Sequence, residues 1–597
     1  MSHISSNFMK QFINTFIAVI LGLIVGGFLL MIGTIVVVST ITGSISSETT
    51  FIPKEKTILK IDLTGREREY IQTDPFAFLF GEDRQELSLQ KQLQAISAAK
   101  NDPKIAGIYL NAKNWSTGIA SAQTLRKALA DFKESGKFVV AYADQYWQST
   151  YYLCSVADKV IVNPQGSIDL HGLQATRSFY TGLMQKLGIN MQIFKVGSYK
   201  SAVEPFIRKD MSAENKEQTL LFLNEQWSSL LEDIGGSRGI DTQELNRKAN
   251  GILMFEDASF YIEHGLADTL LYRSETEKYL KELTETSEKK KLNFASVDEV
   301  CAIAQAPITN TVNEIAILYA EGEISDTSES LYNNTPYITP SLLKEIESLK
   351  TDENVKAVVL RVNSPGGSAY LSEQIWKELN DLKREKPLVV SMGDLAASGG
   401  YYIASCANLI VAEPTTITGS IGVFGIVPDF SGLIGKTGIT FDDVKTNPHA
   451  DFPTLVEPMN EVEKRAMQAY IEKCYRLFLQ RCSEGRNIAI DSIAPFAEGR
   501  VWSGVSAEKI GLIDALGNIE TAIRFASDLA RISEYNTVNY PKQKDLLTLL
   551  LESGAMQLKL LLSPFDKEVL KEFYDVNRLK NIAPIQARIP FDMNTTL

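Results

Sequence analysis

Residues 389–402 read VVSMGDLAASGGYY, and residues 139–152 read VVAYADQYWQSTYY. At the same spacing of 250 residues the likeness extends over 101–164 and 351–414. Matched pairs include Asp102 and Asp352, Lys133 and Lys383, and Pro164 and Pro414. The spacing indicates two diverged copies of one unit. Two copies also fit a chain of 597 residues, because a single core rarely exceeds about 250–300 residues.

Each copy alternates short β-branched runs with helical stretches. In chain order these are Ala106–Leu110, Ala122–Lys133 and Phe138–Tyr142, then Ala357–Val362, Glu373–Lys383 and Leu388–Met392. Strands Thr57–Leu63 and Glu314–Tyr319 are expected to open the two copies, and Ser274–Lys291 to be an exposed helix or connector between them. This alternation predicts an α/β fold with mainly parallel sheets. We expect a tail and anchor over 1–50, repeats over 51–310 and 311–540, and a C-terminal tail over 541–597.

Composition excludes some classes of protein. A formal charge of −13 argues against nucleic-acid binding, which needs a clustered basic face. Five cysteines, an odd number without metal-type spacing, predict neither a disulfide framework nor a metal site. Only four histidines are present, so there are few candidates for the histidine of a Ser-His-Asp triad. No cofactor is expected.

The run Phe16–Val38 is uncharged and apolar. About 20 such residues span a bilayer as a helix, so we expect a transmembrane anchor. Lys10 precedes the run, while Ser39–Phe51 has no Lys or Arg. This bias favours a cytoplasmic N-terminus, with the rest of the chain on the periplasmic or extracytoplasmic side of the inner membrane. The leucine-rich stretch Lys544–Leu562 is expected to pack on the protein, with oligomer or membrane contact as alternatives.

The copies differ at two telling positions. Ser398 has Gln148 as its counterpart, and Lys200 has Ala450. One copy therefore holds a candidate serine nucleophile and the other a candidate lysine base. Since a serine needs an activating base, complementary loss predicts one composite site per chain. A lysine can act as that base if burial lowers its pKa; the alternative is an ordinary solvated lysine.

Three segments of the second copy supply the other groups. The turn in Asn363–Ser368 contains Gly366 and Gly367, whose N–H groups could stabilise an oxyanion. Ser398 lies among small residues at an expected helix N-terminus, where Gly399 offers a further N–H. The alternatives are a plain turn and a helix-capping serine. Ser420, in a tight turn, could hydrogen-bond an amine or be a turn residue only.

These segments resemble a known family. Lys200–Phe206, Asn363–Ser368 and Ala396–Tyr401 are similar to the motifs of signal peptide peptidase A, or protease IV, in its long tandem-domain form. The resemblance implies two crotonase-like (Clp-peptidase-like) domains and a Ser/Lys dyad of Ser398 and Lys200, with Ser420 orienting the lysine. It also implies a membrane-anchored homo-oligomer, which we expect to be a tetramer, that degrades leftover signal peptides.

The sequence thus predicts a membrane-anchored serine endopeptidase acting on apolar peptides. Two rival readings stay open. An acyl-CoA-binding hydratase or isomerase could share the fold, although such enzymes usually rely on carboxylates. A non-catalytic scaffold would leave Ser398 unreactive and the pKa of Lys200 ordinary.

Overall fold

The computed structural model describes Gly26 and residues 51–71, 86–304, 311–326, 336–542 and 585–588. The chain divides into two units, Met1–Ile52 and Pro53–Leu597, and the second carries the fold described below. Apart from Gly26, the expected anchor Phe16–Val38 lies outside the described residues, as does the leucine-rich stretch Lys544–Leu562. Within the described ranges, no helix combines the length and the apolar character that crossing a bilayer requires.

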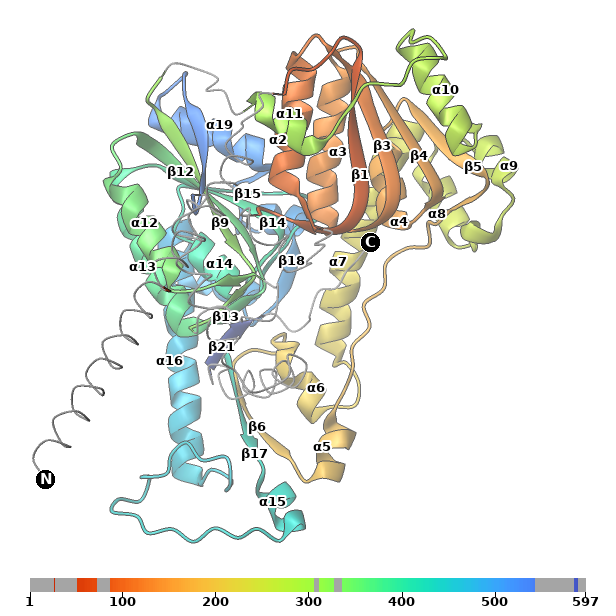
Figure 1. Cartoon of the computed structure of the whole chain (residues 1–597). Helices are drawn as coiled ribbons and strands as arrows, with labels where there is room; N and C mark the ends of the chain where they lie inside the picture. The colour runs from red at the N-terminus through yellow and green to blue at the C-terminus, as the bar shows by residue number, and fades with distance from the viewer. Residues whose placement is uncertain are drawn as a thin grey trace, which may run out of the picture. The chain divides into compact units, whose positions relative to one another are not determined.

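The first repeat is built on a seven-stranded sheet in the order β2-β1-β3-β4-β5-β7, with β8 also paired to β1 (Figure 1). All these pairings are parallel. The strands are β1 Thr57–Arg68, β2 Glu86–Ser88, β3 Ile105–Ser116, β4 Phe138–Tyr146, β5 Lys159–Ile168, β7 Thr269–Leu270 and β8 Phe294–Ala295. The main helices are α2 Leu89–Asn101, α3 Ile119–Lys133, α4 Gln148–Cys154, α7 Ala213–Arg238, α8 Thr242–Ala249, α9 Ala258–Glu263, α10 Arg273–Leu283 and α11 Val297–Ala304.

The second repeat has an eight-stranded sheet in the order β18-β16-β14-β12-β9-β20, with β15 and β19 paired beside β14. Only the pairing of β16 with β18 is antiparallel among those described. The strands are β9 Glu314–Glu321, β12 Val355–Ser364, β14 Leu388–Ala397, β15 Leu409–Ala412, β16 Ile417–Gly419, β18 Val501–Ser503, β19 Ala515–Leu516 and β20 Asn536–Tyr540. The helices are α12 Ser341–Thr351, α13 Ala369–Glu385, α14 Gly399–Ala404, α16 Glu461–Arg486, α17 Ile490–Ile493, α18 Gly504–Lys509 and α19 Ile519–Ala530.

The α/β class and the mainly parallel sheets are confirmed. Strands β12 and β14 are buried along almost their whole length, as expected for parallel strands covered on both faces. The predicted helix Glu373–Lys383 is longer in the structure, because Ser368 caps α13 by accepting from the N–H of Leu371. The stretch Ser274–Lys291 forms most of α10 followed by a turn region, close to the expected helix or connector.

A third sheet, which the sequence did not predict, joins the two repeats. Its order is β11-β10-β13-β21-β17-β6. Its strands are β6 Asn190–Lys195, β10 Glu323–Ile324, β11 Tyr337–Ile338, β13 Gly366–Ser368, β17 Phe424–Asp429 and β21 Ile585–Arg588. Strand β6 of the first repeat pairs antiparallel with β17 of the second over six residues, and Figure 1 shows them side by side, with α5 (Thr181–Leu187) and α15 (Ser431–Thr437) at their lower end. Because of this pairing, the segment after β6, which contains Lys200, lies next to the second repeat.

The repeats keep matching hydrogen bonds. The hydroxyl of Tyr151 donates to the carbonyl of Leu266 (2.9 Å), and the hydroxyl of Tyr401 donates to that of Leu512 (2.8 Å). The ion pairs Arg238–Asp268 and Arg486–Asp514 also correspond. All four acceptor residues lie in the segments Gly265–Asp268 and Gly511–Asp514, which match in sequence at a shifted spacing. A tyrosine buried in each copy therefore anchors the same turn.

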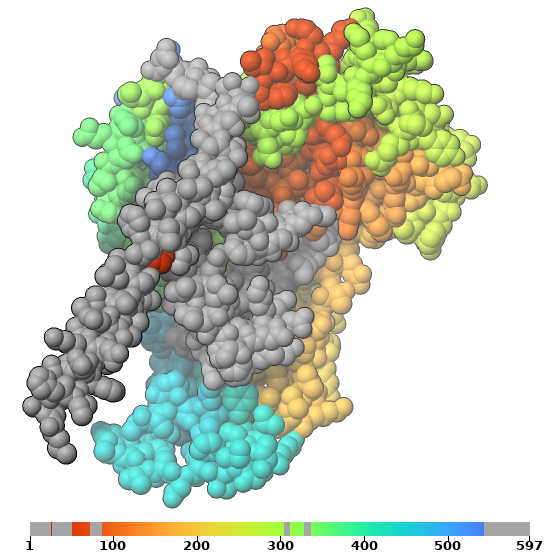
Figure 2. Space-filling model, viewed as in Figure 1, coloured from red at the N-terminus to blue at the C-terminus, as the bar shows by residue number. Residues whose placement is uncertain are grey.

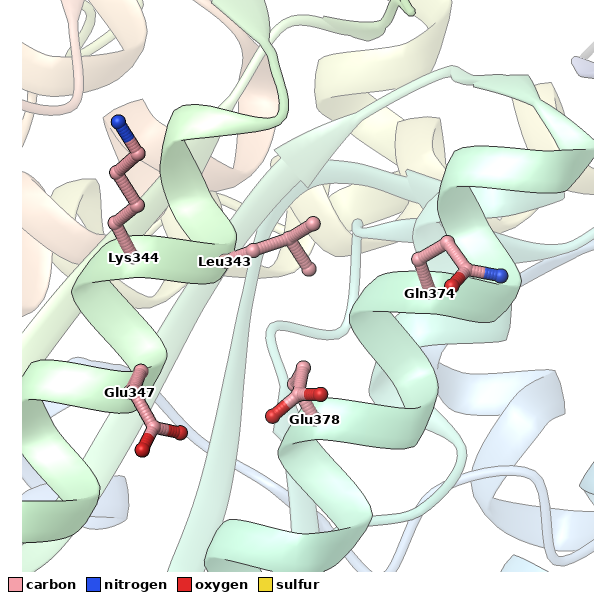
Figure 3. Close-up of a pocket in the computed structure, with 5 residues that line it drawn as sticks. All are labelled: Leu343, Lys344, Glu347, Gln374 and Glu378. Atoms are coloured by element: carbon pink, nitrogen blue, oxygen red, sulfur yellow. The ribbon is translucent and has the colours of Figure 1, made fainter.

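A surface pocket of about 400 Å³ lies between α12 and α13 (Figure 3). Its lining consists of Leu343, Lys344, Glu347, Gln374 and Glu378. Lys350 forms ion pairs with both carboxylates of this lining, at 2.5 Å to Glu347 and 3.6 Å to Glu378. These contacts balance the acidic charge of the pocket, and none of the serine and lysine motifs contributes to it.

Replacing Tyr401 with Phe should lower the free energy of unfolding by about 1–3 kcal/mol, because the buried carbonyl of Leu512 loses its donor. Tyr151→Phe should have a similar effect through Leu266. Urea unfolding followed by tryptophan fluorescence measures both, with the exposed Tyr180 replaced by Phe as the control. Equal stability of all three variants would contradict this account of the repeat symmetry.

Candidate active site

Lys200 is fully buried, and its Nζ lies 2.8 Å from the Oγ of Ser398. The same Nζ donates to the carbonyl oxygen (3.2 Å) and the Oγ (3.1 Å) of Ser420. The lysine comes from the first repeat and both serines from the second. The structure therefore brings together, within one chain, the three side chains singled out in the sequence.

Ser398 sits between β14 and α14 with φ 56° and ψ −115°. A positive φ is unusual for a residue with a Cβ and stores strain, which is common at functional sites. Ser398 occupies the position before α14, but its hydroxyl makes no capping hydrogen bond there. The alternative of a simple helix-capping serine is thus wrong for this hydroxyl, which faces Lys200 instead.

Ser420 follows β16, which pairs with β14 so that the two serines leave adjacent strands. Its backbone also has a positive φ, 51°, and its N–H donates to the carbonyl of Arg500 (2.7 Å). Its Oγ accepts from Lys200 and donates to the carbonyl of Gly499 (3.3 Å). Ser420 therefore holds the lysine amine through two hydrogen bonds, in addition to the contact of that amine with Ser398.

The segment carrying Lys200 is held by α7. The hydroxyl of Ser201 donates to Asn215 (3.0 Å), and the amide of Gln218 donates to the carbonyl of Tyr199 (3.2 Å). Gln218 in turn accepts from the N–H of Val501 in the second repeat (3.1 Å). These bonds fix the lysine against β18.

The stem of Lys200 packs against Gly499 and Gly422, a role that the sequence did not predict for either glycine. A Cβ on Gly499 would lie 2.6 Å from the Cβ of Lys200, and one on Gly422 would lie 3.3 Å from its Cδ. The ring of Phe424 is 5.9 Å from Nζ. Burial in these surroundings lowers the pKa of Lys200 well below its ordinary value. The close approach is a tertiary feature, so the sequence alone offered no signal for Gly499.

The turn with Gly366 and Gly367 lies at the end of β12. The φ angles of these residues are 93° and 153°, and a Cβ on Gly367 would lie 2.0 Å from the carbonyl oxygen of Ile324. Glycine is therefore required there. The N–H of Gly366 donates to the Oγ of Ser364 (3.1 Å), so it can serve another acceptor only by giving up that bond. Gly399 begins α14, so its N–H has no acceptor within the helix.

The corresponding positions in the other copy hold no catalytic group. Gln148 accepts from the N–H groups of His171 (2.9 Å) and Gly172 (3.0 Å), and it donates to the carbonyl of Gly172 (3.1 Å). Its side chain thus ties a loop of the first repeat. Ala450 is exposed. The geometry therefore provides one Ser–Lys pair in the described part of the chain.

The described histidines have other contacts. His171 bonds Asp169 (2.8 Å), His449 bonds Glu463 (2.8 Å), and the ring of His264 packs on Phe260. These three histidines therefore contact other residues, and the group that faces Ser398 is the amine of Lys200.

Comparison with known proteins identifies the family. Peptidase family S49 matches this chain twice, over residues 131–287 and 380–533. Protease 4 of Salmonella typhi is 37% identical over 81% of this chain and 79% of its own length. The chloroplastic serine protease SPPA of Arabidopsis thaliana is 33% identical over 75% of this chain and 66% of its own length. The ClpP catalytic domain from Plasmodium falciparum overlaps 34% of this chain and 85% of that domain, at 14% identity and a TM-score of 0.21. The double family match and the two related proteases show that the chain is a serine peptidase and belongs to peptidase family S49.

Proposed function

We propose that this peptidase is a membrane-anchored endopeptidase that works through a dyad of Ser398 and Lys200. The observation that carries the proposal is the 2.8 Å contact between the buried amine and the serine hydroxyl. Family membership supports a peptidase over the acyl-CoA enzyme and the scaffold.

The contacts of Nζ fit a neutral amine. Such an amine has two N–H donors and one lone pair, whereas an ammonium has three donors and no acceptor. Ser420 takes both N–H bonds, one at its carbonyl oxygen and one at Oγ. The lone pair is then left for the hydroxyl hydrogen of Ser398. This distribution supports Lys200 as the base and Ser420 as its orienting residue.

The reaction follows from this arrangement. The Oγ of Ser398 attacks the peptide carbonyl while its proton passes to Nζ of Lys200. The oxyanion is stabilised by the N–H of Gly399 and that of Gly366 or Gly367. The resulting ammonium donates its proton to the leaving amine, and the peptide C–N bond breaks. Water, deprotonated by Lys200, then hydrolyses the acyl-enzyme and restores Ser398.

The third sheet indicates how a substrate binds. Strand β21 lies between β13 and β17 and pairs antiparallel with both. On one side Ala587 is paired with Gly367, and on the other Gln586 is paired with Phe424. An extended segment thus fits directly beside the glycine turn. We infer that a substrate strand takes the place of β21, by the addition of a strand to a sheet.

The substrate class and location rest on the resemblance to signal peptide peptidase A. It supports signal-peptide remnants and other apolar peptides as substrates. Phe16–Val38 would anchor the chain in the inner membrane, with the catalytic part on the periplasmic or extracytoplasmic side, close to such peptides. Protease accessibility in intact cells tests this orientation.

A homo-oligomer, with a tetramer as the suspected state, is part of the proposal. Several large apolar side chains are exposed around α5 and α15, in the segments coloured yellow and cyan in Figure 2. They are Tyr180, Leu183, Leu187, Ile439, Phe441 and Val444. Apolar side chains gathered on one surface are typical of contact with a partner, and a second copy is the occupant we favour. Light scattering gives the subunit number.

Ser398→Ala and Lys200→Ala should each lower kcat/KM on a fluorogenic apolar peptide by at least about 10²–10⁴-fold, the usual contribution of a positioned base. The exposed Lys209 replaced by Ala is the control and should keep full activity. A fluorophosphonate probe should label the wild type and not Ser398→Ala. Full activity of Lys200→Ala would refute the dyad.

The rate should depend on pH through Lys200. Only the neutral amine accepts a proton, so kcat/KM should rise with pH as Lys200 is deprotonated. Because burial lowers the pKa of Lys200, this rise should be complete well below pH 10.5, the ordinary value. A rise centred near pH 10.5 in the measured pH profile would contradict a buried neutral base.

The pH dependence of stability provides an independent check. Below pH 10.5 the unfolded lysine binds a proton that the folded one, above its lowered pKa, does not. The free energy of unfolding of the wild type should therefore rise with pH relative to Lys200→Met, by about 1.4 kcal/mol per pH unit within that window. Parallel urea titrations of the two proteins measure the difference, and equal slopes would mean that the pKa of Lys200 is ordinary.

Backbone N-methylation of a peptide substrate tests the strand geometry. Because β21 is paired on both sides, consecutive N–H groups of a substrate strand should be engaged, those facing β13 and those facing β17 in turn. Methylating either of two neighbouring positions beside the scissile bond should lower kcat/KM by about fivefold or more, since each lost bond costs about 1 kcal/mol. Methylation at a remote terminus is the control. Unchanged cleavage of all methylated peptides would exclude strand addition.

A further inference from the structure

A buried network at the boundary between the repeats involves the two strands that lead to the glycine turn and to Ser398. Its centre is Glu69, which follows β1 of the first repeat and is 3% exposed. Glu69 accepts from Arg361 at both carboxylate oxygens (3.0 and 3.1 Å) and from the amide of Asn363 (3.1 Å). Arg361 and Asn363 belong to β12, immediately before the turn that carries Gly366 and Gly367.

The network also reaches β14. The carbonyl oxygen of the Asn363 side chain accepts from the N–H of Leu395 (3.1 Å), and its amide lies 3.4 Å from Asp394. Asp394 accepts from the N–H (2.9 Å) and the hydroxyl (2.6 Å) of Ser121, which belongs to α3 of the first repeat. Carboxylates from both repeats are therefore joined through one asparagine.

Asn363 occupies an irregularity between the two strands. Val362 pairs with Met392 and Ser364 with Ala396, so one residue of β12 stands opposite three residues of β14. Regular ladder pairing is interrupted at this point, and the Asn363 side chain supplies a bond to the backbone of β14. The two strands pair once more, at Ser364 and Ala396. Beyond this pair, β12 leads into the glycine turn and β14 leads to Ser398.

Two glycines make room for the carboxylates. A Cβ on Gly393 would lie 2.4 Å from a Glu69 carboxylate oxygen, and one on Gly118 would lie 2.0 Å from the carboxyl carbon of Asp394. Each carboxylate thus packs directly on the backbone of the other repeat. In the first repeat the counterpart of Asp394 is Asp144, which bonds Tyr142 and Arg273 of its own repeat. The contact across the boundary is peculiar to the copy that carries the serine.

We propose that Asn363, Glu69 and Asp394 are positioning residues, which set the glycine turn at the correct distance from Ser398 for oxyanion binding. The proposal rests on the peptidase mechanism above. The physical reason is that oxyanion donors act only within a narrow distance, and a misplacement of about 1 Å can cost 10²-fold in rate. Through Glu69, the first repeat thereby helps to stabilise the transition state without contacting the substrate.

The test compares Asn363→Ala with Asn408→Ala in the full chain. Asn408 accepts from the N–H of Leu388 (2.8 Å) at the opposite end of the same strand β14, so Asn408→Ala removes the corresponding bond to the backbone of β14 and leaves the bonds of Asn363 to Glu69 and Asp394 intact. We expect kcat per probe-labelled site to fall about 10–100-fold in Asn363→Ala, with KM changed less than about twofold. Asn408→Ala should keep the kcat of the wild type. The affinity for a peptide aldehyde, whose adduct with Ser398 places an oxyanion in the site, should fall by the same factor as kcat.

A second pair of variants tests the proposal in case Asn363→Ala does not fold. Asp394→Asn should lower kcat in the same manner, whereas Asp144→Asn should not. The low-pH limb of the rate profile should stay in place in all variants, because Lys200 is not disturbed. Equal kcat in each variant and its control would overturn the positioning proposal while leaving the dyad intact. If the fluorophosphonate probe did not label the wild-type protein, the dyad itself would be overturned.

Discussion

The burial of one amine, that of Lys200, is the constraint on which the rest of the structure depends. An ammonium without a counter-ion is costly in a medium of low polarity, and burial is what lowers the pKa of Lys200. Gly499 and Gly422 allow the backbone to close around the stem. Ser420 accepts from Nζ at its carbonyl oxygen and at its Oγ, and the Oγ of Ser398 lies 2.8 Å from the same nitrogen. In the proposed mechanism, the packing around Lys200 is therefore what activates Ser398.

Such packing explains why two copies share one site. The lysine enters after β6 of the first repeat, and β6 pairs with β17 of the second. The amine is therefore enclosed by groups from both copies, and neither copy could bury it alone. Gln148 now serves a structural role in its own loop.

The sequence predicted what local pattern and duplication determine. The α/β class followed from alternating runs, and Ser398, Lys200 and Ser420 followed from short motifs and from the comparison of the copies. Gly499, Glu69 and the third sheet did not, because each acts on residues hundreds of positions away in the chain: Glu69 bonds Arg361, and β21 pairs with β13. A single sequence contains no periodic signal for such contacts.

The boundary between the repeats also concentrates the features that cost stability. Ser398 and Ser420 have positive φ angles, Lys200 is fully buried, and Glu69 is a buried carboxylate whose pairing with Arg361 does little more than offset desolvation. Each of these would weaken a small domain. Here two extensive cores of parallel sheet lie on either side and offset the cost. The duplicated fold therefore supplies more than a second half of the site, since it provides the stability that a strained and desolvated active site consumes.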